Sequence, residues 1–118
     1  MGMALKSDVT AACKANGSMK PVDLVHLGGM TMGDRDLEAE VLSIFVKQSQ
    51  IYLTAWKAAK DAVGRKQAAH LLKGAARGIG AWELAKLAEA AEYPGFGDEN
   101  AITCELNAVC AYIRSLRD

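Results

Sequence analysis

Apolar residues recur at intervals of three and four positions along four stretches of this chain, and this is the spacing of one face of an α-helix. The longest stretch begins near residue 34 and is predicted to run for about seven turns, ending near Asp61–Gly64. Further helices are predicted over residues 65–78, over residues 81–93 and after Asp98. Four amphipathic helices with short connections predict an all-α fold, an antiparallel up-and-down four-helix bundle over residues 21–118.

The segment before the bundle has a different pattern. Residues 1–20 contain Asn16–Ser18 and no sustained apolar stripe, so we predict a mobile N-terminal arm or a loosely packed helix there. A short additional helix is expected over Pro21–Leu27, because proline suits the first turn of a helix. The Gly28-Gly29 pair is expected to end this helix, and Thr31 and Asp34 are candidates for a capping box at the next one.

Length and charge exclude several classes of protein. A chain of 118 residues can form one domain with a core, but not a bundle together with a nucleotide-binding kinase domain. Its 14 basic and 14 acidic residues cancel, so no overall charge draws it to nucleic acid or to an anionic membrane. No apolar stretch approaches the roughly 20 residues of a membrane span, and the first residues lack a signal-peptide core. We expect a cytoplasmic monomer whose helices bury their own apolar stripes.

His70 is predicted to face solvent on the helix at 65–78. Successive residues turn by about 100° around a helix axis, which separates a polar face from an apolar one. The polar face carries Lys66, His70, Lys73, Gly74 and Arg77, whereas the apolar face carries Ala68, Leu71, Leu72, Ala75 and Ile79. Cations around an exposed imidazole would offset the roughly two negative charges of a phosphoryl group on its nitrogen.

Gly74 lies one helical turn after His70. A glycine inside a helix costs about 1 kcal/mol relative to alanine, so a reason for it is expected. The absence of a side chain here would let the active site of another protein close over the imidazole.

The order His70-Leu71-Leu72-Lys73-Gly74, followed by Gly80, Leu84 and Glu92, resembles the signature of histidine-containing phosphotransfer domains. The resemblance covers about residues 21 to 117 and extends upstream to Asp23-Leu24, Leu27 and the segment Thr31–Asp34. It implies a four-helix bundle that presents a phosphorylatable histidine and relays phosphoryl groups between the aspartates of receiver domains.

Carried over by position, the resemblance implies that His70 is the phospho-acceptor. Lys73 and Gly74 resemble its electrostatic and steric neighbours, and Arg77 adds a weaker positive field from the next turn. Many members have a small polar residue after the glycine, where this chain has Ala75. That departure leaves the motif intact but removes one hydrogen bond.

Glu92 matches the position whose polar side chain orients the imidazole in that family. A reversal near residue 79 would place His70 opposite residues 88 to 92, so either Glu92 or Glu89 could approach it. The carboxylate would fix the imidazole tautomer and leave the other nitrogen free to attack phosphorus. The chain would then be a phosphocarrier without an enzyme activity or cofactor of its own, and the partner receiver domain would supply Mg²⁺ and the aspartate.

Two other functions remain open. A helical interaction module could bind a receiver or another signalling protein without phosphotransfer, and it would keep its activity when His70 is replaced by glutamine. A metal or cofactor bundle would need histidines and carboxylates aimed at the core. The chain has two histidines and no repeated Glu-x-x-His, and Cys13, Cys104 and Cys110 show no metal-ligand spacing. We therefore expect no metal site and free cysteine thiols.

Two further groups of residues have competing interpretations. His26 lies among apolar residues of the short helix, so a structural role is expected rather than a second phosphorylation site. Met30 and Met32, with Leu27, could form an apolar patch beside the His70 surface where a receiver docks, or could be ordinary core.

Overall fold

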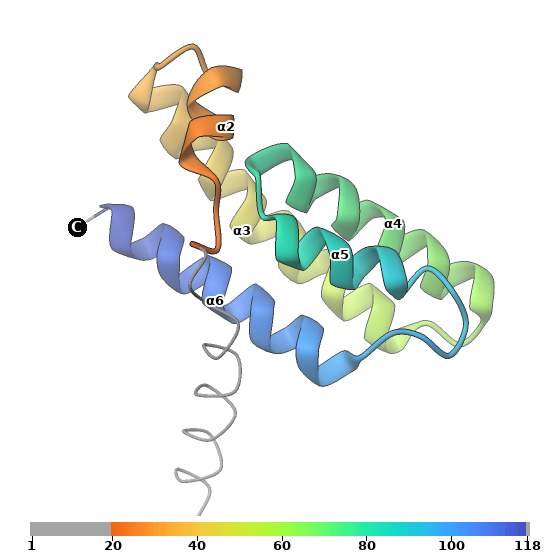
Figure 1. The fold of residues 1–118 in the computed structure, drawn as a ribbon. Helices are drawn as coiled ribbons and strands as arrows, with labels where there is room; N and C mark the ends of the chain where they lie inside the picture. Colours follow the sequence, from red (N-terminus) through yellow and green to blue (C-terminus); the bar gives the residue numbers. More distant parts are fainter. Residues whose placement is uncertain (1–19, 118) are drawn as a thin grey trace, which may run out of the picture.

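The computed structural model describes residues 20–117, and these form five helices with no strand among them (Figure 1). The helices are α2 (Leu24–Met30), α3 (Arg35–Ala58), α4 (Ala62–Ile79), α5 (Trp82–Ala90) and α6 (Glu99–Arg117). The prediction of an all-α bundle with a short additional helix is confirmed. The predicted arm covers residues 1–20, and all of it except Lys20 lies outside the described residues.

The long helices α3 and α4 run alongside each other, while α5 packs on α4 and α6 closes the other side of the core (Figure 1). α2 lies at the end of the bundle where α4 terminates. Each helix contributes residues that are almost completely buried, and each fully buried large apolar side chain stabilises the fold by roughly 1.5–3 kcal/mol. The largest of them are Trp56, Leu27, Leu72, Leu84, Ile102, Leu106 and Ile113.

Four aspartates mark the starts of four helices. The carboxylates of Asp23, Asp34, Asp61 and Asp98 each accept a hydrogen bond from a backbone N–H two or three residues further along the chain. These N–H groups have no partner inside the helix, so each cap satisfies a donor that the first turn would otherwise leave open. The predicted cap at Asp98 is confirmed.

The short helix lies further along the chain than predicted. It spans Leu24–Met30 rather than Pro21–Leu27, because the carboxylate of Asp23 caps it and so sets its start. The Gly28-Gly29 pair was expected to end the helix but lies within it. The chain leaves the helix after Thr31, where the next two residues have φ angles of 55° and 78°.

The candidate capping box of Thr31 and Asp34 does not form. Thr31 belongs to the end of α2, since its hydroxyl donates to the carbonyl of Leu27 at 3.0 Å. Asp34 caps α3 alone, accepting the N–H of Leu37 at 3.1 Å.

The predicted ends of the two central helices also shift. α3 ends at Ala58, before the predicted Asp61–Gly64, because Asp61 instead caps α4, which begins at Ala62 rather than at residue 65. α5 ends at Ala90, so Glu92 lies in the turn after the helix and not within it.

The connection between α4 and α5 is held by Asp23 from the start of α2. Gly80 ends α4 with a φ of 79°, and its carbonyl accepts the N–H of Asp23 at 2.9 Å. The indole N–H of Trp82 donates to Oδ2 of Asp23 at 3.0 Å. These contacts set the position at which α4 reverses into α5, and therefore which residues of the two helices face each other.

None of the helices in the described residues combines the length and apolar character that a membrane span requires.

The cysteines agree with the prediction of free thiols only in part. Cys110 is a free and buried thiol, as predicted, and its burial raises its pKa. The prediction of a free thiol is wrong for Cys104, which is disulfide-bonded, and Cys13 lies outside the described residues.

Candidate functional site

His70 lies in the middle of α4 with 65% of its side chain exposed, as predicted. The buried face of α4 consists of Ala68, Ala69, Leu72, Ala76 and Ile79. Leu71 was predicted on this apolar face but is exposed. It lies at the edge of the apolar stripe, outside the arc of α4 that these buried residues occupy.

Glu92 links His70 to Lys73. Its Oε1 lies 3.4 Å from Nδ1 of His70, and its Oε2 lies 2.6 Å from Nζ of Lys73. The carboxylate is 10% exposed and the lysine side chain 14%, so this pair is largely shielded from water. Although Glu92 lies past the end of α5, the antiparallel hairpin still places it beside the imidazole.

The charge of Glu92 is stabilised by its neighbours. The ion pair with Lys73 is the main cause that lowers the pKa of Glu92, and the contact with His70 acts in the same direction. Burial opposes both effects, because removal from water disfavours a charged carboxylate. Glu92 is therefore an ionised acceptor facing Nδ1 of His70.

Glu89 and Arg77 form the outer part of this network. Nη2 of Arg77 lies 3.3 Å from Oε2 of Glu89, and Nζ of Lys73 lies 4.0 Å from the same oxygen. The structure thus places Glu92 rather than the alternative Glu89 against His70. Lys73 and Arg77 of α4 therefore face Glu89 and Glu92, which lie at and just after the C-terminal end of α5.

Gly74 adjoins open space. A Cβ built on this residue would meet no atom within 4 Å, so no neighbouring helix requires a glycine here. This excludes helix packing as its reason and leaves the surface beside His70 unobstructed.

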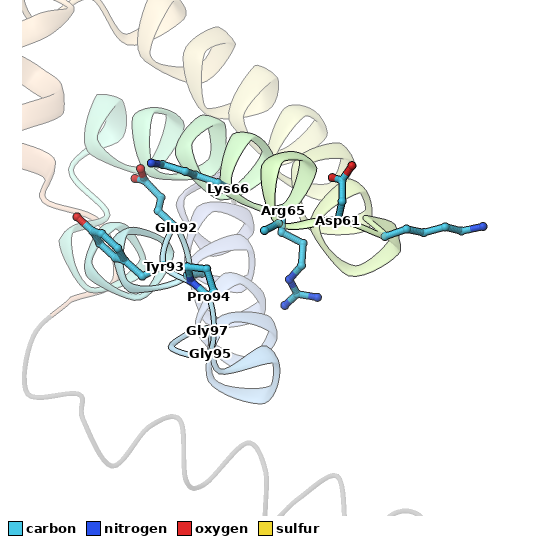
Figure 2. A pocket seen from close by; sticks show the side chains of 11 residues that line it. Asp61, Arg65, Lys66, Glu92, Tyr93, Pro94, Gly95 and Gly97 are labelled. Atoms are coloured by element: carbon cyan, nitrogen blue, oxygen red, sulfur yellow. The ribbon is translucent and has the colours of Figure 1, made fainter.

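Lys66 lies one turn before His70 and is exposed. It lines a groove between the start of α4 and the loop that follows α5, and Glu92 and Tyr93 line the same groove (Figure 2). From the sequence, Pro94–Gly97 is predicted only as a loop, and Lys60, which also lines the groove, is not predicted to lie near the site. The proline and two glycines after α5 indicate a loop, but they do not indicate which residues of α4 lie beside it.

The other residues considered from the sequence, His26 and the group of Leu27, Met30 and Met32, do not contact His70. His26 is half-buried in α2 and packs edge-to-face on Trp82, with ring centroids 4.9 Å apart, which fits its expected structural role. Met30 and Met32 are exposed, whereas Leu27 is completely buried, so the three do not form one exposed patch.

An exposed histidine on a helical bundle, with its ring nitrogen against a carboxylate and a lysine one turn away, defines the class of histidine phosphotransfer domains. The crystal structure of the histidine phosphotransferase ShpA from Caulobacter crescentus is similar, with a TM-score of 0.69 and 31% sequence identity over 82% of this chain and 90% of that one. No family model and no curated protein matches the chain. The chain belongs to the histidine phosphotransferase family, and its role is in phosphotransfer.

The lowered pKa of Glu92 predicts a dependence of stability on pH. Since the folded state lowers this pKa below its ordinary value of 4.5, ionised Glu92 stabilises the fold above that pH, and the contribution is lost as pH falls through the folded-state value. We expect Glu92→Gln to lower the free energy of unfolding at pH 7, and the difference from the native chain to shrink below pH 4.5.

Urea unfolding of both proteins at neutral and acidic pH would measure this difference. Asp23 also has a lowered pKa, owing first to the hydrogen bond from Trp82, but it is present in both chains and cancels in the comparison. A difference that stays constant between pH 7 and pH 3, or grows on acidification, would contradict the stabilising role of ionised Glu92.

Proposed function

We propose that this chain is a phosphocarrier in which His70 accepts and donates a phosphoryl group between the aspartates of receiver domains. The observation that carries the proposal is the position of the imidazole: it is 65% exposed, and Nδ1 is the nitrogen that faces Glu92. Nε2 is therefore the nitrogen available for reaction. We further propose that the chain acts as a monomer in the cytoplasm, without catalysing a reaction on a separate substrate.

The carboxylate of Glu92 supports the reactive tautomer. When Nδ1 carries the proton and donates to Glu92, the lone pair of the imidazole is on Nε2. Nε2 attacks phosphorus in line, the N–P bond forms as the O–P bond of the donor's aspartyl phosphate breaks, and the aspartate leaves as a carboxylate. Reversal of the step passes the group to another receiver. Mg²⁺ on the receiver would neutralise charge on the transferring group.

Lys73 and Arg77 supply positive charge on the same side of α4. Nζ of Lys73 lies 2.6 Å from the carboxylate of Glu92 and 4.0 Å from that of Glu89. A phosphoryl group on His70 would add acceptor oxygens near this ammonium. We propose that Lys73 stabilises the phosphohistidine, with Arg77 contributing from the next turn.

A two-step transfer assay tests the function. The chain is phosphorylated with phosphoramidate, freed of the donor, and mixed with isolated receiver domains with and without Mg²⁺. We expect the acid-labile phosphoryl group to leave the chain and an acyl phosphate to appear on a receiver only when Mg²⁺ is present. If the labelled chain binds receivers but transfers nothing to any of them, and if His70→Gln binds equally well, the protein is an interaction module.

Gly74 offers a prediction in which stability and function change in opposite directions. We expect Gly74→Leu to raise the free energy of unfolding by about 0.5–1 kcal/mol, because leucine favours a helix and nothing obstructs its Cβ. The added side chain flanks His70, so we expect slower transfer to a receiver. Urea unfolding and the transfer assay measure the two effects.

Gly78→Ala is the matched control for Gly74→Leu, because Gly78 is also in α4 and its Cβ would also meet nothing within 4 Å. It should gain helix stability without slowing transfer. Equal transfer rates for Gly74→Leu and the native chain would show that access over residue 74 is not needed.

A further inference from the structure

Cys104 is the one cysteine of the described residues that takes part in a disulfide bond. Its partner is not Cys110, the other cysteine of α6, which is a free thiol. The geometry of a helix also excludes that pair, because residues 104 and 110 are about 9 Å apart along a helix axis, whereas the Cα atoms joined by a disulfide are usually about 4.4–6.8 Å apart. Cys104 is therefore bonded to a cysteine outside α6.

Cys104 lies on the outer side of α6. The apolar stripe of this helix, which includes Leu106 and Ile113, is buried, and the helical repeat places Cys104 roughly opposite to Ile113. The neighbours of Cys104 on the outer side, Asn107 and Ala111, are exposed. The disulfide partner therefore approaches α6 from outside the core and not from α3 or α5, which pack against its buried side.

The cysteine count identifies the partner. The sequence contains three cysteines, and since Cys110 is free, Cys13 is the remaining partner within the chain. It precedes the described residues. We propose that Cys13 and Cys104 form a redox-responsive disulfide that fastens the N-terminal segment of the chain to the outer side of α6. The bond closes a loop that contains α2, α3, α4 and α5.

The proposed cytoplasmic location makes this bond reversible. Small thiols keep most disulfides reduced in the cytoplasm, and those that form there are mostly transient or redox-sensing. Cys110 does not compete for the bond, because it is buried and its raised pKa disfavours the reactive thiolate. Cys104, on the outer side of α6, is in reach of small thiols and disulfides. Oxidation therefore pairs Cys104 with Cys13 and leaves Cys110 as a thiol.

The oxidant is a small disulfide such as oxidised glutathione. The thiolate of one cysteine attacks this disulfide, its S–S bond breaks, and a mixed disulfide forms as one small thiol leaves. The thiolate of the second cysteine then attacks the protein sulfur of the mixed disulfide, which forms the bond between Cys13 and Cys104 and releases a second small thiol. Two protein thiols are oxidised, one small disulfide is reduced, and the two protons pass to the released thiols.

A count of free thiols tests the proposal. The full chain is incubated with oxidised glutathione or with a dithiol reductant, freed of the reagent, unfolded and treated with N-ethylmaleimide before intact-mass analysis. We expect one maleimide, on Cys110, after oxidation and three after reduction. Digestion of the oxidised chain with trypsin and a glutamate-specific protease should give a crosslinked pair of peptides that contains Cys13 and Cys104, because cleavage after Glu105 separates Cys104 from Cys110.

Urea unfolding provides a second readout. A crosslink that closes a long loop restricts the unfolded chain, so the urea midpoint should be higher by at least about 1 M in the oxidised chain than in the reduced one. Cys13→Ser should abolish this difference, and the matched control Cys110→Ala should retain it. Three maleimides after oxidation, glutathione retained on Cys13 and Cys104, or a disulfide-linked dimer would overturn the proposal. None of these outcomes bears on the phosphocarrier function, because no step involves His70.

Discussion

Replacement of His70 by glutamine is expected to abolish phosphorylation of this chain completely. Glutamine has similar polarity and can remain on the exposed face of α4, but its amide has no nucleophilic lone pair like that of an imidazole nitrogen. Intact-mass analysis after incubation with phosphoramidate measures the effect. The native chain should gain the mass of one acid-labile phosphoryl group, and His70→Gln should gain none.

The second histidine of the sequence provides the matched control. His26 is half-buried on Trp82 in α2, away from the carboxylate that contacts His70. His26→Gln should therefore be phosphorylated to the same extent as the native chain, provided that its helical circular dichroism is unchanged. Phosphorylation of His70→Gln, or loss of labelling only in His26→Gln, would show that His70 is not the acceptor.

Gly80→Ala is expected to lower the free energy of unfolding by about 3 kcal/mol. Gly80 has a φ of 79°, a conformation that an L-residue with a Cβ rarely adopts. A Cβ there would also lie 2.8 Å from Cβ of Asp23 and 3.0 Å from its carbonyl oxygen. Relief of the clash requires movement of Asp23, whose N–H donates to Gly80 and whose carboxylate accepts the hydrogen bond of Trp82, so α4, α5 and α2 would all be disturbed.

Urea unfolding followed by tryptophan fluorescence measures this loss, and Gly33→Ala separates its two causes. Gly33 has a φ of 78°, but a Cβ there would meet nothing within 4 Å. This control should lose only the roughly 1 kcal/mol that reflects the backbone conformation. If Gly80→Ala is no more destabilised than Gly33→Ala, the close approach of Asp23 to Gly80 does not contribute.

The positions of the helices followed from periodicity, but their ends were less predictable. A Gly28-Gly29 pair was expected to end a helix and instead lies within α2, because the capping carboxylate of Asp23 shifts the start of that helix. Asp61 is a similar case: its side chain can end one helix or begin the next, and the structure shows that it begins α4. Local propensity distinguishes these alternatives poorly, since tertiary contacts routinely outweigh it.

The candidate site was predictable only where it depends on one helix. The polar face of α4 depends only on the helical repeat, so the exposure of His70 and the accessibility of Gly74 could be derived from the sequence. The exposure of Leu71 could not, because an apolar residue near the edge of a helical stripe is buried only if a neighbouring element covers it. That coverage is set by how the helices cross.

The sequence by itself determined the all-α class, the amphipathic helices and the solvent-facing position of His70, because these depend on spacing along one chain segment. Only the tertiary structure decided between Glu92 and Glu89, paired Arg77 with Glu89, and formed the groove between the start of α4 and Tyr93. Each of these contacts joins α4 to α5 or to the turn and loop that follow α5, and their relative register depends on the reversal at Gly80. That reversal is held by the distant Asp23, which donates its N–H to Gly80 and accepts the indole N–H of Trp82, and no local spacing encodes these contacts.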